Sequence, residues 1–247
     1  MTAKTKTRLL RALYFTVLIS FLAPIIYLCF EIALYDPESA TRYKGDYVLM
    51  LVQCVLGAIV IHIPTILTHK ARIDIPVPLY VLYIIFLYCA ISLGEIGSFY
   101  IWFPHWDDIL HGMSSVMTGF FGYMLIAILN REAKRKLHLS PFFVALFAFC
   151  FSVTIGTLWE IYEFSFDTVL GLNMQKFIGA NGEILEGQKA LFDTMKDLIV
   201  DTIGAAIATV IGLISVHRKG WVHGYLESTV VVPLRQEKEN TTANARK

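Results

Sequence analysis

The sequence predicts an all-α fold, a polytopic bundle of about six transmembrane helices, from three observations. The composition is 56% hydrophobic and only 17% charged, whereas a soluble domain has about a quarter of its residues charged. The apolar residues are gathered into runs of about 20, the length that crosses roughly 30 Å of hydrocarbon. These runs lack the short alternating segments of a barrel, so they must be helices, which satisfy their own backbone hydrogen bonds in lipid.

Six apolar runs qualify as spans. The first, from Leu9 to Leu34, follows a basic N-terminus but is too long for the apolar region of a signal peptide. We expect one bundle over residues 1–218, followed by a polar cytoplasmic tail at 219–247 that is disordered. The expected spans lie at about 10–34, 47–67, 77–102, 108–130, 141–166 and 197–216.

The distribution of Lys and Arg predicts the orientation of the bundle. If the spans alternate, one side receives Lys4, Lys6, Arg8, Arg11, Lys70, Arg72, Arg131, Lys134, Arg135, Lys136, Arg218 and Lys219. Cytoplasmic connections carry such an excess, so both termini are expected in the cytoplasm of a cell with this protein in its plasma membrane. A net charge of +1 argues against a nucleic-acid partner, and the expected partner is membrane lipid. The sequence leaves the oligomeric state open.

Acidic residues with one histidine gather at the predicted outer ends of the spans. An ionisable group inside a span costs about 2.5–3.5 kcal/mol at mid-bilayer, so such groups indicate a functional site. Their spacings of three, four, seven or eight residues place each set on one helix face. The sets are Asp107, Asp108 and His111 on the fourth span, Glu160, Glu163 and Asp167 on the fifth, and Asp193, Asp197 and Asp201 leading into the sixth, with Glu95 in the outer half of the third.

So many carboxylates at one depth would repel one another unless they are protonated, paired or bound to a metal. Many oxygens with one imidazole suit Mg²⁺, Mn²⁺ or Ca²⁺, and fewer acids with the histidine would suit Zn²⁺. The expected ligands are Asp107, His111, Glu160, Glu163 and Asp197, with Glu160 and His111 also the candidate catalytic groups. No organic cofactor is expected. The simpler alternatives are helix caps, protonated glutamates in interhelical hydrogen bonds, and a packing histidine.

The motifs together resemble the YjdF-like family of bacterial inner-membrane proteins. That family's Asp-x-x-x-His matches Asp107 and His111, and its Glu-x-x-Glu matches Glu160 and Glu163. Its Asp-Thr-x-x-Asp and later glycine match Asp193, Thr194, Asp197 and Gly204. The departure is Ser115, where the family pattern has glycine. The resemblance covers roughly residues 80–215 and implies about six spans in a bacterial plasma membrane, but no reaction. VanZ-like membrane proteins are similar to a lesser degree.

Three functions are compatible with these residues. A metal-dependent hydrolase could act on a lipid head group or a cell-envelope component, with Glu160 as general base. A cation- or proton-coupled transporter could use the intramembrane acids, although no matching set lies near the cytoplasmic ends. A metal-sensing or scaffold protein would bind a cation without turnover or flux. We expect an outer-facing ligand site, with the hydrolase as its most concrete form and transport as the alternative.

Overall fold

The computed structural model describes residues 3–40, 42–70, 75–132, 139–179 and 182–217, and its regular structure there is helical. Six segments of these residues are long and apolar enough to cross a membrane, which confirms the predicted fold class. In chain order the elements are α1 (Ala3–Ala33), α2 (Lys44–Val60), α3 (Ile63–Lys70), α4 (Val77–Leu87), the π-helix η1 (Tyr88–Ile96), α5 (Phe99–Trp102), α6 (Trp106–Glu132), α7 (Pro141–Leu170) and α8 (Gln188–His217).

The bounds of several expected spans differ from the structure, and three of these differences have a clear cause or affect the candidate site. The second is α2 and α3 with a break at Ile61 and His62, just before Pro64, because proline removes a backbone donor. The third ends at Ile96 and not at 102, since Ser98 adopts the left-handed conformation (φ 62°) and starts the separate α5. The sixth begins already at Gln188, which places the whole acidic stripe of the sixth span on α8.

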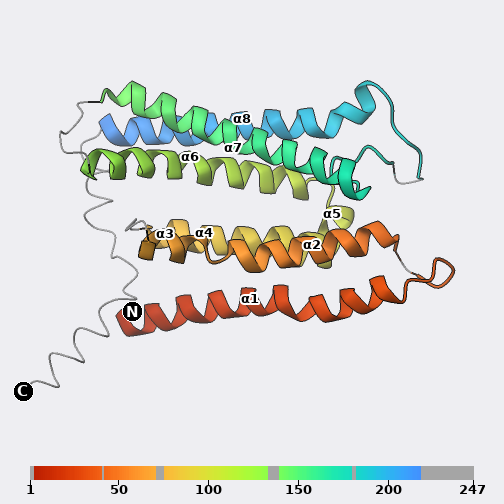
Figure 1. The fold of residues 1–247 in the computed structure, drawn as a ribbon. Helices are drawn as coiled ribbons and strands as arrows, with labels where there is room; N and C mark the ends of the chain where they lie inside the picture. The colour runs from red at the N-terminus through yellow and green to blue at the C-terminus, as the bar shows by residue number, and fades with distance from the viewer. Residues whose placement is uncertain (1–2, 41, 71–74, 133–138, 180–181, 218–247) are drawn as a thin grey trace, which may run out of the picture.

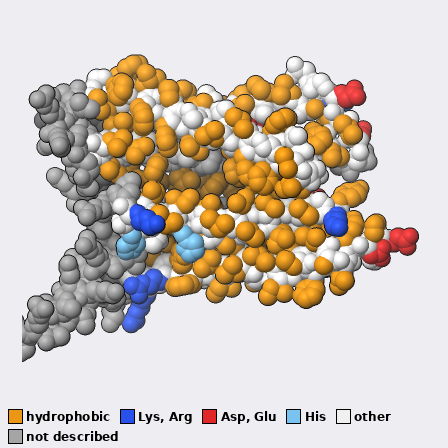
Figure 2. All heavy atoms as spheres, in the orientation of Figure 1, with side chains coloured by type: hydrophobic (Ala, Val, Ile, Leu, Met, Phe, Trp, Pro, Cys, Tyr) orange, Lys and Arg blue, Asp and Glu red, His pale blue; other side chains and the backbone are white. Residues whose placement is uncertain are grey.

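The helices run roughly parallel to one another and form two groups, called the two halves of the bundle (Figure 1). One half contains α1, α2, α3, α4 and η1, and the other contains α6, α7 and α8. The halves touch near one end, where Trp106 Nε1 donates a hydrogen bond to the Cys89 carbonyl, and near the other, where Ile75 packs with Met124 and Ile128. Between these contacts Figure 2 shows a hollow on the face in view, bordered by hydrophobic side chains.

Small residues bring α6, α7 and α8 close together. A Cβ on Gly204 of α8 would overlap the side chain of Ser115 on α6, and one on Gly122 would stand 2.9 Å from the Ala148 Cα on α7. Close approach through such residues is the usual means of packing helices in lipid, where burial of apolar surface gives little driving force. Ser152 Oγ on α7 also donates to the Ser115 carbonyl at 2.7 Å, so a polar contact joins α6 to α7.

The connection from α7 to α8 folds over one end of the second half. Gly171, at φ 65°, ends α7, which is the usual role of glycine at a helix C-terminus. Within this connection, one antiparallel bridge joins Ile178 and Ile184. The N-terminal end of α1 and the C-terminal end of α8 lie at the opposite end of the bundle (Figure 1). The expected disordered tail at 219–247 lies outside the described residues.

Candidate metal centre

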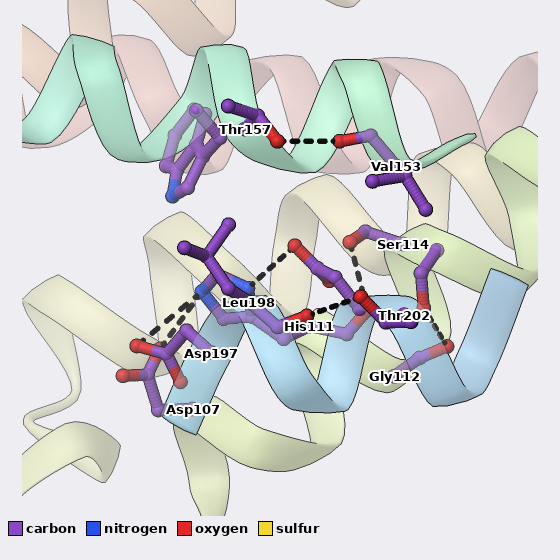
Figure 3. Close-up of polar contacts among 12 residues, drawn as sticks. Asp107, His111, Gly112, Ser114, Val153, Thr157, Asp197, Leu198 and Thr202 are labelled. Atoms are coloured by element: carbon purple, nitrogen blue, oxygen red, sulfur yellow. Dashed lines mark hydrogen bonds and ion pairs between the residues drawn. The ribbon is translucent and has the colours of Figure 1, made fainter. Parts of the chain in front are cut away.

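His111 of α6 is the centre of a buried group of carboxylates. Its side chain is 8% exposed, and its Nδ1 lies 3.3 Å from Asp201 Oδ2 on α8. Its Nε2 lies 3.8 Å from Asp107 Oδ1 and 4.0 Å from Asp197 Oδ2. Figure 3 shows the imidazole directed at Asp107 and Asp197, while the hydroxyls of Ser114 and Thr202 bond back to carbonyls of their own helices. The two ring nitrogens of one imidazole therefore lie near carboxylates from α6 and α8.

The local sequence explains why these side chains meet. Asp107 and His111 are four residues apart on α6, and Asp197 and Asp201 are four apart on α8, so each pair occupies one helix face. Gly204 allows α8 to approach α6 one turn beyond Asp201. Gly156 of α7 is equally necessary, because a Cβ there would overlap the Asp201 carboxylate.

The acids of α7 differ in their partners. Both carboxyl oxygens of Glu160 are buried without a hydrogen-bond partner among the described residues, and the residue is 5% exposed. Glu163 accepts a hydrogen bond from Trp159 Nε1 at 2.9 Å. Asp167 accepts hydrogen bonds from the backbone N–H groups of residues 174 and 175 at 2.8 and 2.9 Å. Only Glu160 of these three is thus an acid with both oxygens unengaged.

Two lysines neutralise acids at the rim of the group. Lys176 Nζ, from the α7–α8 connection, contacts Asp107 Oδ2 and lies 3.1 Å from Asp193 Oδ1. Lys196 Nζ lies 2.7 Å from Asp108 Oδ1. Burial alone would lower the pKa of Lys176, but Asp107 and Asp193 outweigh it and raise that pKa above its ordinary value. The two aspartates therefore stabilise the charged form of Lys176 at this rim.

Three donors satisfy the spacing of a metal site. Ligand atoms of Asp107, His111 and Asp197 all lie within 4.8 Å of one another. Two ligands at 2.0–2.6 Å from a shared ion and about 90–110° apart are separated by about 3–4 Å. The distances from His111 Nε2 fall in this range and are too long for hydrogen bonds. Asp197 is 1% exposed, and its Oδ1 has no partner among the described residues. These three residues form a group that could hold a divalent cation.

Asp201 contacts Nδ1 of His111, the ring nitrogen that faces away from Asp107 and Asp197. A proton on Nδ1 donated to Asp201 leaves the Nε2 lone pair directed at the space between Asp107 and Asp197. Histidine ligands of metals commonly donate their other N–H to a carboxylate in this way, which fixes the tautomer and the ring orientation.

The structure separates the predicted site residues into groups. It brings together Asp107, His111 and Asp197, with Asp201 behind the histidine. Glu160 is buried beside them, with His111 and Asp201 among its electrostatic neighbours, but is outside the three-donor set. Of the remaining candidates, Asp108 and Asp193 pair with lysines and Asp167 with loop amides. Glu163, which is bonded to Trp159, and Glu95, half-buried on η1, both have Asp107 among their electrostatic neighbours.

Sequence reasoning missed Lys176 as part of the site. Lys176 lies in a connection without regular structure, so periodicity says nothing about where its side chain points. Its only local signal is the acidic character of the spans on either side. Lys196 could have been found, because helical spacing places it near the α8 acids once α8 is known to begin at Gln188.

Comparison with known proteins identifies the family. Residues 11–218 match the family described as "Predicted membrane protein (DUF2238)". The chain belongs to this family. An uncharacterized protein of Thermotoga maritima is 34% identical over 112 residues, which is 45% of this chain. The match spans about half the length of that relative, 50%. No solved structure matches the chain. The family shows a membrane protein, in agreement with the six apolar segments, and names no activity.

Proposed function

We propose that this membrane protein binds a divalent cation through Asp107, His111 and Asp197. The observation that carries the proposal is the convergence of these three donors within 4.8 Å in a buried position. A carboxylate such as Asp197, 1% exposed and with an unpartnered oxygen, is costly unless a cation neutralises it. The contact of Asp201 with the far nitrogen of the imidazole supports the same conclusion. An imidazole among carboxylates makes Mn²⁺ and Zn²⁺ the first ions to test.

The activity that we propose for this centre is hydrolysis of a phosphoester in a lipid head group or a cell-envelope precursor. Three protein ligands leave coordination positions open, which is the pattern of catalytic sites, and a divalent cation supplies Lewis-acid polarisation. Glu160 is the proposed general base, since its unpartnered carboxyl can accept a proton. The water oxygen bonds to phosphorus as the ester P–O bond breaks. The water proton passes to Glu160 and then to the leaving oxygen.

We place the centre near the extracytoplasmic face of a bacterial plasma membrane. The support is the distribution of Lys and Arg over the sequence, which predicts cytoplasmic termini. The N-terminal end of α1 and the C-terminal end of α8 lie at one end of the bundle (Figure 1). The helices α6 and α8 begin at the other end, and the acidic group lies in their first turns. The motif resemblance to the YjdF-like family supports the bacterial assignment. Cysteine labelling from outside intact cells, at single sites in the α7–α8 connection and before α1, tests this orientation.

Elemental analysis of detergent-purified protein tests the cation site. Asp107 and Asp108 provide a matched pair, since both are aspartates in the first turn of α6 but only Asp107 belongs to the three donors. We expect about one ion per chain in the wild type and in Asp108→Asn, and loss of the ion in Asp107→Asn and Asp197→Asn. A folded wild type without stoichiometric metal, or loss in Asp108→Asn alone, would reject the assignment.

A panel of phosphoester lipids with Mn²⁺ or Zn²⁺ tests the hydrolase. Glu160→Gln is expected to retain the ion and to lower turnover by about 10²-fold or more, the usual contribution of a general base. Glu163→Gln is the control, because Glu163 is engaged with Trp159. Equal turnover in wild type and Glu160→Gln would remove Glu160 from this role. Cation or proton flux in proteoliposomes without hydrolysis would replace the hydrolase by a transporter, and binding with neither would leave a sensor or scaffold.

A further inference from the structure

We propose that Lys176 is a tethered cation that competes with the divalent ion for Asp107 and so makes the centre selective for doubly charged ions. This inference rests on the cation site proposed above and concerns how that site is controlled. Lys176 does not belong to the spans that supply the ligands, and it reaches them from the α7–α8 connection.

The connection is built to present this lysine. The carboxylate of Asp167, at the end of α7, accepts hydrogen bonds from the backbone N–H groups of the two residues before Lys176. The Gln175 side chain donates to Thr194 Oγ1 on α8 at 2.8 Å. Asn173 exchanges two hydrogen bonds with the backbone of Ile178, at 2.8 and 2.9 Å, and so closes the turn around the lysine. The backbone on both sides of Lys176 is therefore held by Asp167 and Asn173, and the Gln175 side chain ties the connection to α8.

Lys176 occupies a backbone conformation that is unfavourable for it. Its φ is 49°, in the left-handed region that residues with a Cβ rarely adopt and glycine adopts freely. Residues held in such conformations are typically over-determined by their surroundings and gather at functional sites. The anchored turn and the contacts of the ammonium with two aspartates supply that restraint here.

Lys176 shares one carboxylate with the candidate metal centre. Asp107 Oδ2 contacts the Lys176 ammonium, while Oδ1 of the same carboxylate faces His111 Nε2. A divalent cation bound through Asp107 would lie next to this ammonium, and two positive charges at such a distance repel each other strongly in a poorly solvated site. Binding must therefore weaken or break the contact between Lys176 and Asp107.

The geometry permits this displacement. The Lys176 side chain is 42% exposed, so its flexible stem can move into water without unfolding the connection. An incoming singly charged ion merely replaces the ammonium charge, whereas a divalent ion adds a charge that other buried acids, such as Asp197 and Glu160, can balance. The tethered ammonium should consequently exclude monovalent ions more effectively than divalent ones.

Mn²⁺ titration of the full-length protein in detergent, with free Mn²⁺ followed by electron paramagnetic resonance, tests the inference. Lys176→Met removes the charge and keeps a long side chain. We expect it to bind Mn²⁺ about tenfold more tightly or better, the gain when a charge-assisted contact no longer has to break. We also expect Na⁺ or K⁺ to compete with Mn²⁺ in this variant but not in the wild type.

Two further variants make the result specific. Lys176→Arg keeps the charge and should retain the weak affinity and the selectivity of the wild type. Lys196→Met is the matched control, because Lys196 pairs with Asp108 outside the three donors, and its gain in Mn²⁺ affinity should be much smaller than that of Lys176→Met. The wild type binding Mn²⁺ and Lys176→Met binding it no more tightly would show that Lys176 does not compete with the ion. The proposed cation site would then be unaffected.

Amine labelling separates the two proposals. Acetylation of Lys176 is followed by mass spectrometry, with Lys196 as an internal reference. It should be faster in the Mn²⁺-bound wild type than in the metal-free wild type. It should also be faster in metal-free Asp107→Asn, which lacks the aspartate charge. Mn²⁺ binding without faster Lys176 labelling overturns the displacement. Absence of Mn²⁺ binding in the wild type and in Lys176→Met overturns the cation site, and the competition with it.

Discussion

The two halves of the bundle are held together by different kinds of contact. The half containing α1, α2, α4 and η1 packs large apolar side chains, with Phe21, Leu28 and Ile84 almost fully buried. The half containing α6, α7 and α8 uses glycine, alanine and serine contacts, and it buries His111 with several carboxylates. The first half is therefore stabilised by apolar packing, whereas the second contains buried polar groups that are costly in a membrane and mark it as the place of the candidate site.

The largest expected effect comes from the apolar half. Phe21→Ala should lower the free energy of unfolding by about 3–5 kcal/mol, because Phe21 is 0% exposed and its ring fills the space over Gly57. Denaturation in mixed detergent micelles measures the change. Mn²⁺ affinity in the folded protein should remain that of the wild type. A loss of Mn²⁺ affinity at a permissive temperature would show that the two halves are coupled.

A smaller effect is expected where α8 approaches α6. Gly204→Ala should destabilise the protein by about 1–3 kcal/mol through overpacking against Ser115 and the Gly112 carbonyl, and it should weaken cation binding. Gly112→Ala is the control, since its Cβ would meet Val200 at an ordinary 3.7 Å and alanine favours a helix. Equal thermal stability of the two variants would contradict the close packing of α6 and α8.

The acid of α7 should show a conflict between stability and function. Glu160→Leu is expected to raise the free energy of unfolding by about 1–2 kcal/mol, because it removes a buried carboxyl with no partner, and to abolish hydrolysis. Glu163→Leu should not stabilise, since it leaves the Trp159 N–H unpaired. Thermal unfolding of metal-free protein decides the matter, and a destabilised Glu160→Leu would show that Glu160 has a structural role.

The smallest effect concerns the connection that carries Lys176. Asp167→Asn should cost about 1 kcal/mol, because an amide group would face one of the two backbone N–H groups that the carboxylate now accepts. Hydrogen exchange should accelerate at residues 174–178. Asp36→Asn in the other half removes similar contacts to Glu38 and Ser39 and should loosen only its own loop. Unchanged exchange in Asp167→Asn would show that the connection is held by other contacts.

Helical periodicity explains most of what could be predicted of the site. The spacing of Asp107 and His111, and of Asp197 and Asp201, placed each pair on one face of a helix, and the structure brings those faces together. Periodicity does not set the rotation of one helix against another. For that reason all the acids were candidates from sequence, and the tertiary contacts show which of them have partners of their own, among them Glu163 and Asp167.

The sequence by itself determined the membrane class, the helical fold and the number of apolar segments, because the bilayer imposes length and internal hydrogen bonding on every span. Tertiary structure decided which donors converge, since small residues such as Gly156 and Gly204 set the distances between α6, α7 and α8. It also decided the place of Lys176, whose left-handed backbone and anchored turn depend on contacts with residues far away in the sequence.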